Sequence, residues 1–403
     1  MSWARSIAAG LTTLGVLTAG LSSVTAPGAS AAPAGQTGQS RIAKAGLADA
    51  VPGSYIVTLK DSVARANSAA GQAVARKHGA TVKRTYHQAV NGYSVQASEP
   101  QAERLAGDPA VASVSVDRAF RVSGTQPRPP SWGLDRIDQR NLPLSRSYTY
   151  PGSAGSGVTA YIIDSGVRIT HQDFGGRASY GYDAIDNDHV AQDGNGHGTH
   201  VAAIAAGSRY GVAKKAKIVA VRVLDDAGSG TTEQIVAGID WVTQHAIKPA
   251  VANMSLSGGA DAVVDQAVKK SIASGVTYTV AAGNDGQDAS LHSPARVPEA
   301  ITVGATTERD SRDSLSNYGA ALDLFAPGEF IASAWNASDT ATISDSGTSM
   351  AAPHVAGAAA LYLADHPRAR PGQVASALTA SASTGLVTRP GSGSPNRLLN
   401  IGR

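Results

Sequence analysis

The run from Ser346 to His354 places a serine where it could act as a nucleophile. Ser349 directly precedes a predicted apolar helix over 351–363, and Pro353 fits the first turn of such a helix, where a missing N–H removes little. Backbone N–H groups and the positive end of the helix dipole would favour an oxyanion beside the serine Oγ. Taken alone, the run could equally be an ordinary Ser/Thr helix cap.

Two further segments supply a carboxylate and an imidazole in equally specific settings. Residues 158–163 have the length and composition of a buried strand, and this strand ends in Asp164. Residues 193–200 lead into a predicted helix of small residues at 201–206, with His197 near its amino end. The chain order Asp, His, Ser is a known order for a nucleophilic triad. A serine hydroxyl is a weak nucleophile at neutral pH, so it needs a base, and the base needs an orienting acid.

Three motifs carry a resemblance to subtilisin-type serine proteases, the subtilases. They are Asp164-Ser165-Gly166, His197-Gly198-Thr199-His200 and Gly347-Thr348-Ser349-Met350-Ala351. The likeness spans about 132–399 and is greatest to the proteinase K and aqualysin branch. It implies that Ser349 attacks a peptide carbonyl to give an acyl-enzyme, while His197 carries the proton. Asp164 would hold the imidazole tautomer and stabilise the imidazolium.

The resemblance also implies an oxyanion site and a substrate groove. Asn284 follows a predicted buried strand, where an asparagine is usually a turn residue, but here it would donate its amide to the oxyanion. Protein and peptide substrates would bind as an added strand, through main-chain hydrogen bonds. The residues implied for the groove and its specificity pocket are Gly228, Ser229, Gly230, Ser255, Leu256, Ser257, Ala281, Ala282 and Gly283.

No charged residue stands in these groove segments. We therefore expect broad specificity with a preference for apolar or aromatic side chains before the scissile bond. Ser257 departs from the family, whose members usually have glycine there. Its added Cβ and hydroxyl could narrow the mouth of the pocket.

Calcium is the structural cofactor that the resemblance implies. The chain after Trp132 is rich in side-chain oxygens of the kind Ca²⁺ accepts, although such a stretch could by itself be a solvated turn. The implied ligands are Asp135, Asp138, Gln139, Ser145 and Ser147 at one site, and the Pro298 and Ala300 carbonyls with the Asp323 carboxylate at a second.

A zinc site is a weaker interpretation of the histidines. His200 follows His197 by three residues, but neither an HExxH motif nor an evident third ligand accompanies the pair. We expect His200 and His354 to be packed structural residues.

Composition narrows the remaining possibilities. The 403 residues carry a net charge of only +3, with acids and bases mixed along the chain, so no nucleic-acid partner is expected. The chain has no cysteine, which excludes disulfides and zinc–thiolate sites. A secreted protein of this kind must gain its persistence from its core or from bound metal. We expect a monomer.

The amino-terminal part of the chain predicts export and processing. Residues 1–31 have the pattern of a secretory signal: Arg5, a weakly apolar stretch over 7–24 and the small-x-small site Ala29-Ser30-Ala31. A membrane anchor is the alternative, but the stretch is less hydrophobic than a membrane span requires. After signal removal no membrane association is expected.

The rest of the chain divides into a propeptide at 32–124 and a catalytic domain at 125–403. The ordered part of the propeptide, about 53–122, resembles the inhibitory propeptide of subtilases and would act as an intramolecular inhibitor. In it we predict a strand at 53–59, a helix at 64–78, and strands at 93–97 and 111–116 with a short helix between them. Self-cleavage is expected between about Val122 and Gln126, with the bond just before Thr125 favoured.

The catalytic domain must bring together residues that are far apart in the chain. Predicted strands at 158–163, 217–224, 250–256, 276–281 and 300–303 alternate with helices at 233–245 and 260–274 and with the helix after Ser349. Such alternation implies an α/β fold with a mostly parallel sheet covered by helices on both faces, here preceded by a small α+β domain. Sites in such folds lie at the carboxyl ends of strands, where Asp164 falls.

Two other functions compete with a peptidase. An ester-cleaving acyl hydrolase would use the same triad, but its Gly-x-Ser-x-Gly motif is missing, because the run 347–351 ends in alanine. A binding protein on an inactive protease scaffold would have lost catalytic residues, whereas all four positions are intact. We therefore predict a secreted, self-processing serine endopeptidase.

Overall fold

A computed structural model describes residues 42, 50–118 and 123–402. The predicted signal peptide lies outside this part of the chain. The described residues divide into two compact units, one around 55–115 and the other around 123–402, and the strand ends at 50–54 and 116–118 group with the second unit. None of the helices in the described ranges combines the length and the hydropathy that a membrane span requires.

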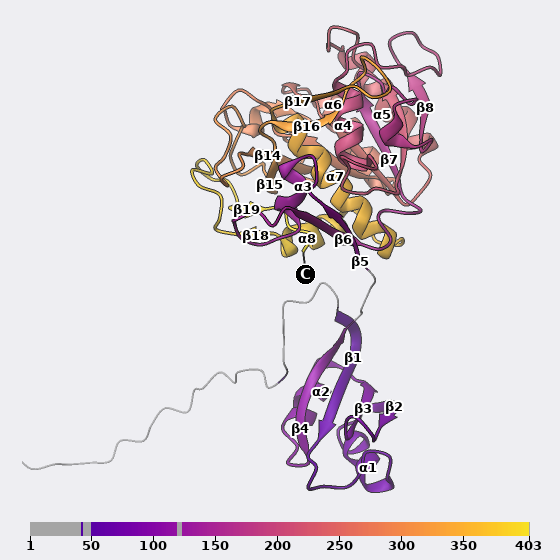
Figure 1. Ribbon diagram of the computed structural model, residues 1–403, viewed down its shortest axis with the longest axis vertical. Helices are drawn as coiled ribbons and strands as arrows, with labels where there is room; N and C mark the ends of the chain where they lie inside the picture. Colours follow the sequence, from indigo (N-terminus) through magenta and orange to yellow (C-terminus); the bar gives the residue numbers. More distant parts are fainter. Residues whose placement is uncertain (1–41, 43–49, 119–122, 403) are drawn as a thin grey trace, which may run out of the picture. The chain divides into compact units, whose positions relative to one another are not determined.

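The first unit is a small α+β domain with a four-stranded sheet in the order β2-β3-β1-β4 (Figure 1). Its elements are β1 (Ala50–Leu59), α1 (Ala69–Lys77), β2 (Thr81–Tyr86), β3 (Gly92–Gln96), α2 (Glu99–Ala106) and β4 (Val111–Arg118). The sequence missed β2, most of which is exposed or half-buried and so lacks an apolar run. Helix α1 begins later than predicted because Ser68 caps it, accepting a hydrogen bond from the Gly71 N–H.

The second unit is built on a nine-stranded sheet. In spatial order its strands are β18 (Ser383–Thr384), β19 (Arg397–Leu398), β15 (Leu324–Pro327), β14 (Ile301–Thr306), β12 (Thr277–Ala281), β10 (Ala250–Met254), β7 (Thr159–Asp164), β9 (Lys217–Arg222) and β8 (Ala178–Asp183). Neighbouring strands are parallel except β18 and β19. The five predicted strands correspond to β7, β9, β10, β12 and β14, which are consecutive in the sheet. The outer strands were not predicted.

Helices cover both faces of this sheet (Figure 1). Alternate residues of β7 point to opposite faces. Ala160 and Ile162 pack with α4 (His197–Ala206) and α7 (Thr348–Asp365). Tyr161 and Ile163 pack with α5 (Thr232–His245) and α6 (Ala262–Ala273). All six residues of β7 are buried. A strand that is buried on both faces is what a continuous apolar run predicts. The predicted fold class is therefore confirmed.

Smaller elements complete the second unit. They are α3 (Trp132–Ile137), α8 (Pro371–Ser381), the 3₁₀ turns η1 (Gln172–Phe174) and η2 (Ala289–Leu291), and three two-stranded ribbons formed by β5 (Ser123–Pro127) with β6 (Ser147–Pro151), β11 (Gly258–Gly259) with β13 (His292–Ser293), and β16 (Ile331–Ala334) with β17 (Thr342–Asp345). The Ser293–Pro294 peptide bond is cis. In β5, Thr125 pairs with Thr149 of β6, so the predicted processing bond lies inside a strand.

Candidate active site

Asp164 and His197 meet at the carboxyl end of β7. The carboxylate is fully buried, and its Oδ1 lies 2.7 Å from the His197 Nδ1 while also accepting a 2.8 Å hydrogen bond from the Ser165 N–H. His197 begins α4, directly after Gly196, whose φ of 116° suits glycine. A Cβ at this position would lie 2.4 Å from the Trp335 ring, so the tight approach also requires glycine. The imidazole is thus held at a helix start against a strand end.

A second carboxylate, Asp193, holds the loop before α4 to the end of β7. It is buried, and its Oδ1 accepts hydrogen bonds from the Gly196 N–H at 2.7 Å and from the Ser165 hydroxyl at 2.9 Å. Its Oδ2 accepts from the Thr199 N–H at 2.9 Å. The Ser165 Oγ in turn accepts from the Gly198 N–H. Sequence reasoning assigned no role to Asp193 or Ser165, although an aspartate three residues before a glycine helix start is a usable signal.

The surroundings of His197 favour its charged form. Burial by itself lowers the pKa of this imidazole, but the charge of Asp164 and the hydrogen bond with it outweigh that effect, and Asp345 and Asp193 add to it. The net result is a His197 pKa above its ordinary value. An imidazolium that forms during a reaction is therefore stabilised where it stands.

Ser349 lies in the first turn of α7, beside the carboxyl ends of the strands. Its hydroxyl donates a 3.2 Å hydrogen bond to the Ser255 carbonyl, and the Ser255 hydroxyl donates a 2.7 Å bond to the Ser349 carbonyl. Within the described ranges, no hydrogen bond joins the Ser349 hydroxyl to His197. Such bonds are often long or misaligned without substrate and tighten in the substrate complex.

Asn284 is oriented by the same helix start. Its side-chain oxygen accepts hydrogen bonds from the Thr348 N–H and the Thr348 hydroxyl, both at 2.9 Å. This pairing leaves the Nδ2 group as the donor toward the cavity, which Asn284 and Ser349 both line. Gly347 comes close to this amide: a Cβ there would lie 3.2 Å from the Asn284 Nδ2. The arrangement places an N–H donor beside the serine, as stabilisation of an oxyanion requires.

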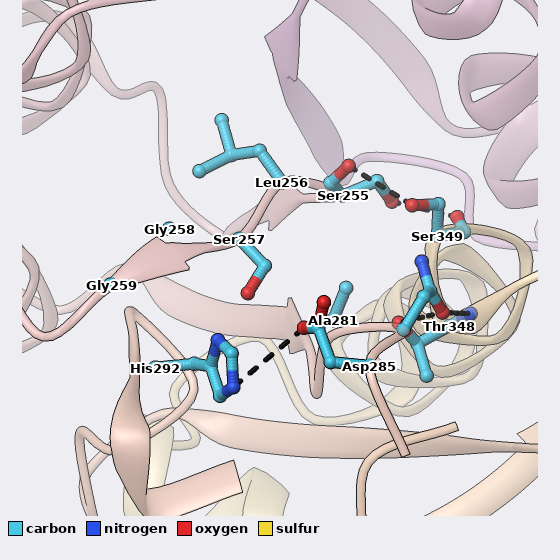
Figure 2. A pocket seen from close by; sticks show the side chains of 11 residues that line it. Ser255, Leu256, Ser257, Gly258, Gly259, Ala281, Asp285, His292, Thr348 and Ser349 are labelled. Carbon is cyan, nitrogen blue, oxygen red and sulfur yellow. Dashed lines mark hydrogen bonds and ion pairs between the residues drawn. The ribbon is translucent and has the colours of Figure 1, made fainter. Parts of the chain in front are cut away.

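Two adjoining cavities share the segment 255–259. The first, of about 360 Å³, adjoins Ser349 (Figure 2) and is lined by Ser255, Leu256, Ser257, Gly258, Gly259, Ala281, Asn284, Asp285, His292, Thr348 and Ser349. The second, of about 780 Å³, extends past His197 to Gly228, Ser229 and Gly230. Seven of the nine predicted groove residues line one of these cavities. Ala282 and Gly283, which are both buried, line neither cavity.

The first cavity is lined by two titratable side chains, although the predicted groove segments contain no charged residue. Asp285 and His292 line it, although neither lies in the segments that the resemblance implied. Asp285 follows Asn284 directly, and His292 arrives through the pairing of β13 with β11. Sequence reasoning missed His292 because the β11–β13 pairing is not visible in either short segment, and it missed Asp285 although this residue adjoins Asn284.

The predicted calcium ligands after Trp132 gather in one place. Asp135 accepts hydrogen bonds from the Ser145 N–H and hydroxyl, and Gln139 accepts from the same N–H. The Ser145 hydroxyl also contacts the Ser147 carbonyl at 3.3 Å. Burial, countered in part by a hydrogen bond from the Thr149 N–H, raises the pKa of Asp138 to about 6.

The second predicted ligand set lies beside the start of β14. Asp323 accepts a 2.8 Å hydrogen bond from the Thr302 N–H, and burial raises the pKa of Asp323 to about 6. Pro298 and Ala300 directly precede the strand. No cluster of three or more His, Cys, Asp or Glu side chains suited to a metal occurs in the described part of the chain.

His200 in α4 and His354 in α7 are fully buried. Burial lowers the pKa of each to about 4, so both are neutral at ordinary pH. The His354 Nδ1 contacts the Met350 carbonyl one turn back in α7, and the His200 Nε2 contacts the Ile343 carbonyl. These contacts are those of packed helix residues.

Comparison with known proteins identifies the family. Residues 155–400 match the subtilase family (peptidase S8), and residues 54–123 match the peptidase inhibitor I9 family. An "Extracellular serine proteinase" of Thermus sp. (strain Rt41A) is 49% identical over 386 residues, which cover 91% of this chain and 94% of the relative. An "Alkaline serine exoprotease A" of Vibrio alginolyticus is 48% identical over 79% of this chain and 60% of its own length.

A solved structure agrees with these sequence relatives. The crystal structure of a cold-adapted subtilisin-like serine proteinase superposes with a TM-score of 0.65 at 54% identity, covering 67% of this chain and 97% of its own. The chain belongs to the subtilase family. It is therefore a serine endopeptidase of the subtilisin type, and its I9 segment marks it as a zymogen.

Proposed function

We propose that this chain is a secreted endopeptidase of broad specificity that uses Asp164, His197 and Ser349 as its triad. The observation that carries the proposal is the 2.7 Å contact between Asp164 and His197, because His197 lines a cavity that adjoins the one lined by Ser349. Ser349 attacks the peptide carbonyl, and His197 accepts its proton and then delivers it to the leaving amine. Asp164 holds the Nδ1–H tautomer, so that Nε2 is the base.

The groove accounts for the rest of the reaction. The Asn284 Nδ2 and the Ser349 N–H stabilise the oxyanion of the tetrahedral intermediate. Substrate extends as a strand between segments 228–230 and 255–257, and the 360 Å³ cavity takes the side chain before the scissile bond. Leu256 and Ala281 supply apolar wall there, which supports a preference for apolar or aromatic side chains.

A serine-directed phosphonylating or sulfonylating reagent tests the assignment of the nucleophile. We expect it to abolish peptidase activity in parallel with the attachment of one equivalent to Ser349, located by peptide mass mapping. The heat-unfolded chain is the control and should not react, because a serine hydroxyl is a weak nucleophile without its base. Attachment to a different residue of the native protein would remove Ser349 from the mechanism.

Self-processing follows from the order of the units. We propose a signal peptide at 1–31, a propeptide at 32–124 that inhibits the enzyme, and a monomeric catalytic domain at 125–403. Within the part of the chain described, β5 does not line the cavity at Ser349. The bond before Thr125 therefore reaches the triad only when β5 is unpaired from β6. Extracellular location is supported by the name of the Thermus relative.

Calcium fits the chemistry of the first ligand set. Subtilases commonly bind calcium. The Asp138 Oδ1 is buried and has no hydrogen-bond partner among the described residues, an arrangement that a cation would relieve. We propose that Asp135, Asp138, Gln139, Ser145 and Ser147 hold one calcium ion, and that Asp323 with the Pro298 and Ala300 carbonyls holds another. A bound ion would contribute stability by binding only the folded state.

Chelation should lower the melting temperature and leave initial rates of hydrolysis intact. Without metal, the raised Asp138 pKa means that the folded state binds a proton more readily than the unfolded chain does. The metal-free protein should thus lose stability as pH rises from about 4 through 6, and chelation should destabilise more at pH 8 than at pH 5.

The matched variant is Asp138→Asn, measured by calorimetry with and without chelator. It should show a smaller chelation effect at pH 8, with the remainder due to the Asp323 site. An unchanged melting temperature in the wild type would contradict both calcium sites. Immediate loss of hydrolysis on chelation would instead indicate a metalloenzyme.

A further inference from the structure

An aspartate and a histidine lie together at the cavity that adjoins Ser349. The His292 Nε2 lies 3.7 Å from the Asp285 Oδ2, and both side chains line the cavity. Figure 2 shows Ser257 and His292 across the cavity from Ser349, with Asp285 between His292 and Thr348. The Asp285 side chain is 52% exposed, whereas the His292 side chain is only 14% exposed. A substrate side chain that fills the cavity would therefore approach both groups.

Strand pairing positions His292, whereas its Nε2 forms no hydrogen bond with the described residues. Strand β13 pairs antiparallel with β11, which places Gly259, a residue with no side chain, opposite His292. The Nε2 is buried and has no hydrogen-bond partner in the described ranges, because 3.7 Å to Asp285 exceeds hydrogen-bond length. A substrate group that forms a hydrogen bond with this nitrogen would remove the free-energy cost of leaving it buried and unsatisfied.

The other charged groups around β13 are engaged elsewhere. Helix α6 packs against β13, and its cap Asp261 accepts bonds from α6 backbone N–H groups and from the Thr232 hydroxyl. Asp265 forms an ion pair with Arg296 at 3.2 Å. Asp288 accepts a hydrogen bond from the Ser290 N–H. Among the described residues, Asp285 is thus the charged group that shares the cavity with His292.

We propose that His292 sets the net charge of the specificity cavity and so decides, with pH, whether a basic side chain is accepted before the scissile bond. The proposal rests on the assignment of this cavity to that substrate residue. When His292 is protonated, the pair with Asp285 is neutral overall, and the cavity favours apolar and aromatic side chains. When His292 loses its proton, the cavity carries the single negative charge of Asp285 and attracts a lysine.

The experiment compares two peptides that differ only before the scissile bond, one with lysine and one with norleucine. Norleucine has the lysine chain without its ammonium group, so the ratio of the two kcat/KM values isolates the charge. The ratio also cancels the titration of His197, which serves both peptides alike. Lysine keeps its charge from pH 5 to 9. At low ionic strength we expect the lysine-to-norleucine ratio to rise roughly five-fold across the range in which histidines titrate.

Two variants of the mature enzyme give opposite signatures. His292→Gln leaves the negative charge at every pH, so its ratio should be high and flat. Asp285→Asn changes the cavity from positive to neutral as His292 titrates. Its ratio should therefore be lower than that of the wild type throughout. A merely structural role of His292 would not flatten the ratio.

Either of two results overturns the proposal: a flat ratio in the wild type, or a slope that survives in His292→Gln. These results differ from a failure of the proposed function. If the inhibitor-labelled enzyme still cleaved the norleucine peptide, the nucleophile itself would be wrong. If norleucine cleavage depended on Ser349 but the ratio were flat, only the role of His292 would fall.

Discussion

Replacing Ser349 with alanine is expected to leave the full-length chain unprocessed and to lower kcat about 10⁶-fold, the size of loss known from a subtilisin. The physical reason is that Ser349 lies at the start of α7 and lines the cavity beside Asn284, whose amide would stabilise the oxyanion of an attacked carbonyl. Small residual hydrolysis would persist, because oxyanion stabilisation and binding survive the change. Mass spectrometry of the secreted product and active-site kinetics measure the two effects.

Ser346→Ala is the matched control for this variant. Ser346 lies three residues earlier, and its hydroxyl accepts a hydrogen bond from the Phe330 N–H without lining the cavity. This control should be processed and should hydrolyse peptides at rates close to those of the wild type. A Ser349→Ala chain that still released its propeptide unaided would show that another nucleophile performs the processing.

Asp164→Asn should lower kcat about 10⁴-fold while the fold is retained. An amide can donate to the His197 Nδ1 and so favour the tautomer whose Nε2 carries the proton, which cannot act as a base. The acid limb of the pH profile should also move. In the wild type it should lie above the ordinary histidine value of about 6.5, because Asp164 outweighs burial in raising the His197 pKa. In the variant, the acid limb of the residual activity should lie at a lower pH than in the wild type.

Asp345→Asn separates charge from orientation. Asp345 also raises the His197 pKa, but only through its charge and less than Asp164 does. This variant should shift the acid limb slightly to lower pH and reduce kcat by less than ten-fold. Equal losses in the two variants would mean that the imidazole is not oriented by Asp164. Measurement of kcat/KM from pH 5 to 9 decides between these outcomes.

The central strands and the motif residues were accessible from the sequence for a physical reason. Strands buried on both faces, such as β7 and β10, must be continuous apolar runs, and such runs are visible without a fold. Asp164 stands out because a carboxylate at the end of such a strand is costly unless it has a partner. The helix start at His197 was likewise marked by small residues.

Elements without a continuous apolar run were missed. Strand β8, at the sheet edge, has only two buried residues, with a half-buried residue between them, and β18 and β19 are two residues each. The β5–β6 ribbon depends on pairing between segments that carry no distinctive local pattern. The positions of these strands are set by pairing with strands elsewhere in the chain.

By itself the sequence determined which side chains are available for chemistry and in which order they occur, because a buried strand and a helix start leave local patterns in the residues around them. Only the tertiary structure decided what surrounds them. Asp193 holds the His197 loop, and Asp285 and His292 enter the cavity at Ser349. These arrangements arise from contacts between segments that are separate in the chain, such as β11 with β13, and hydrogen bonds of that kind leave no periodic signal in either segment.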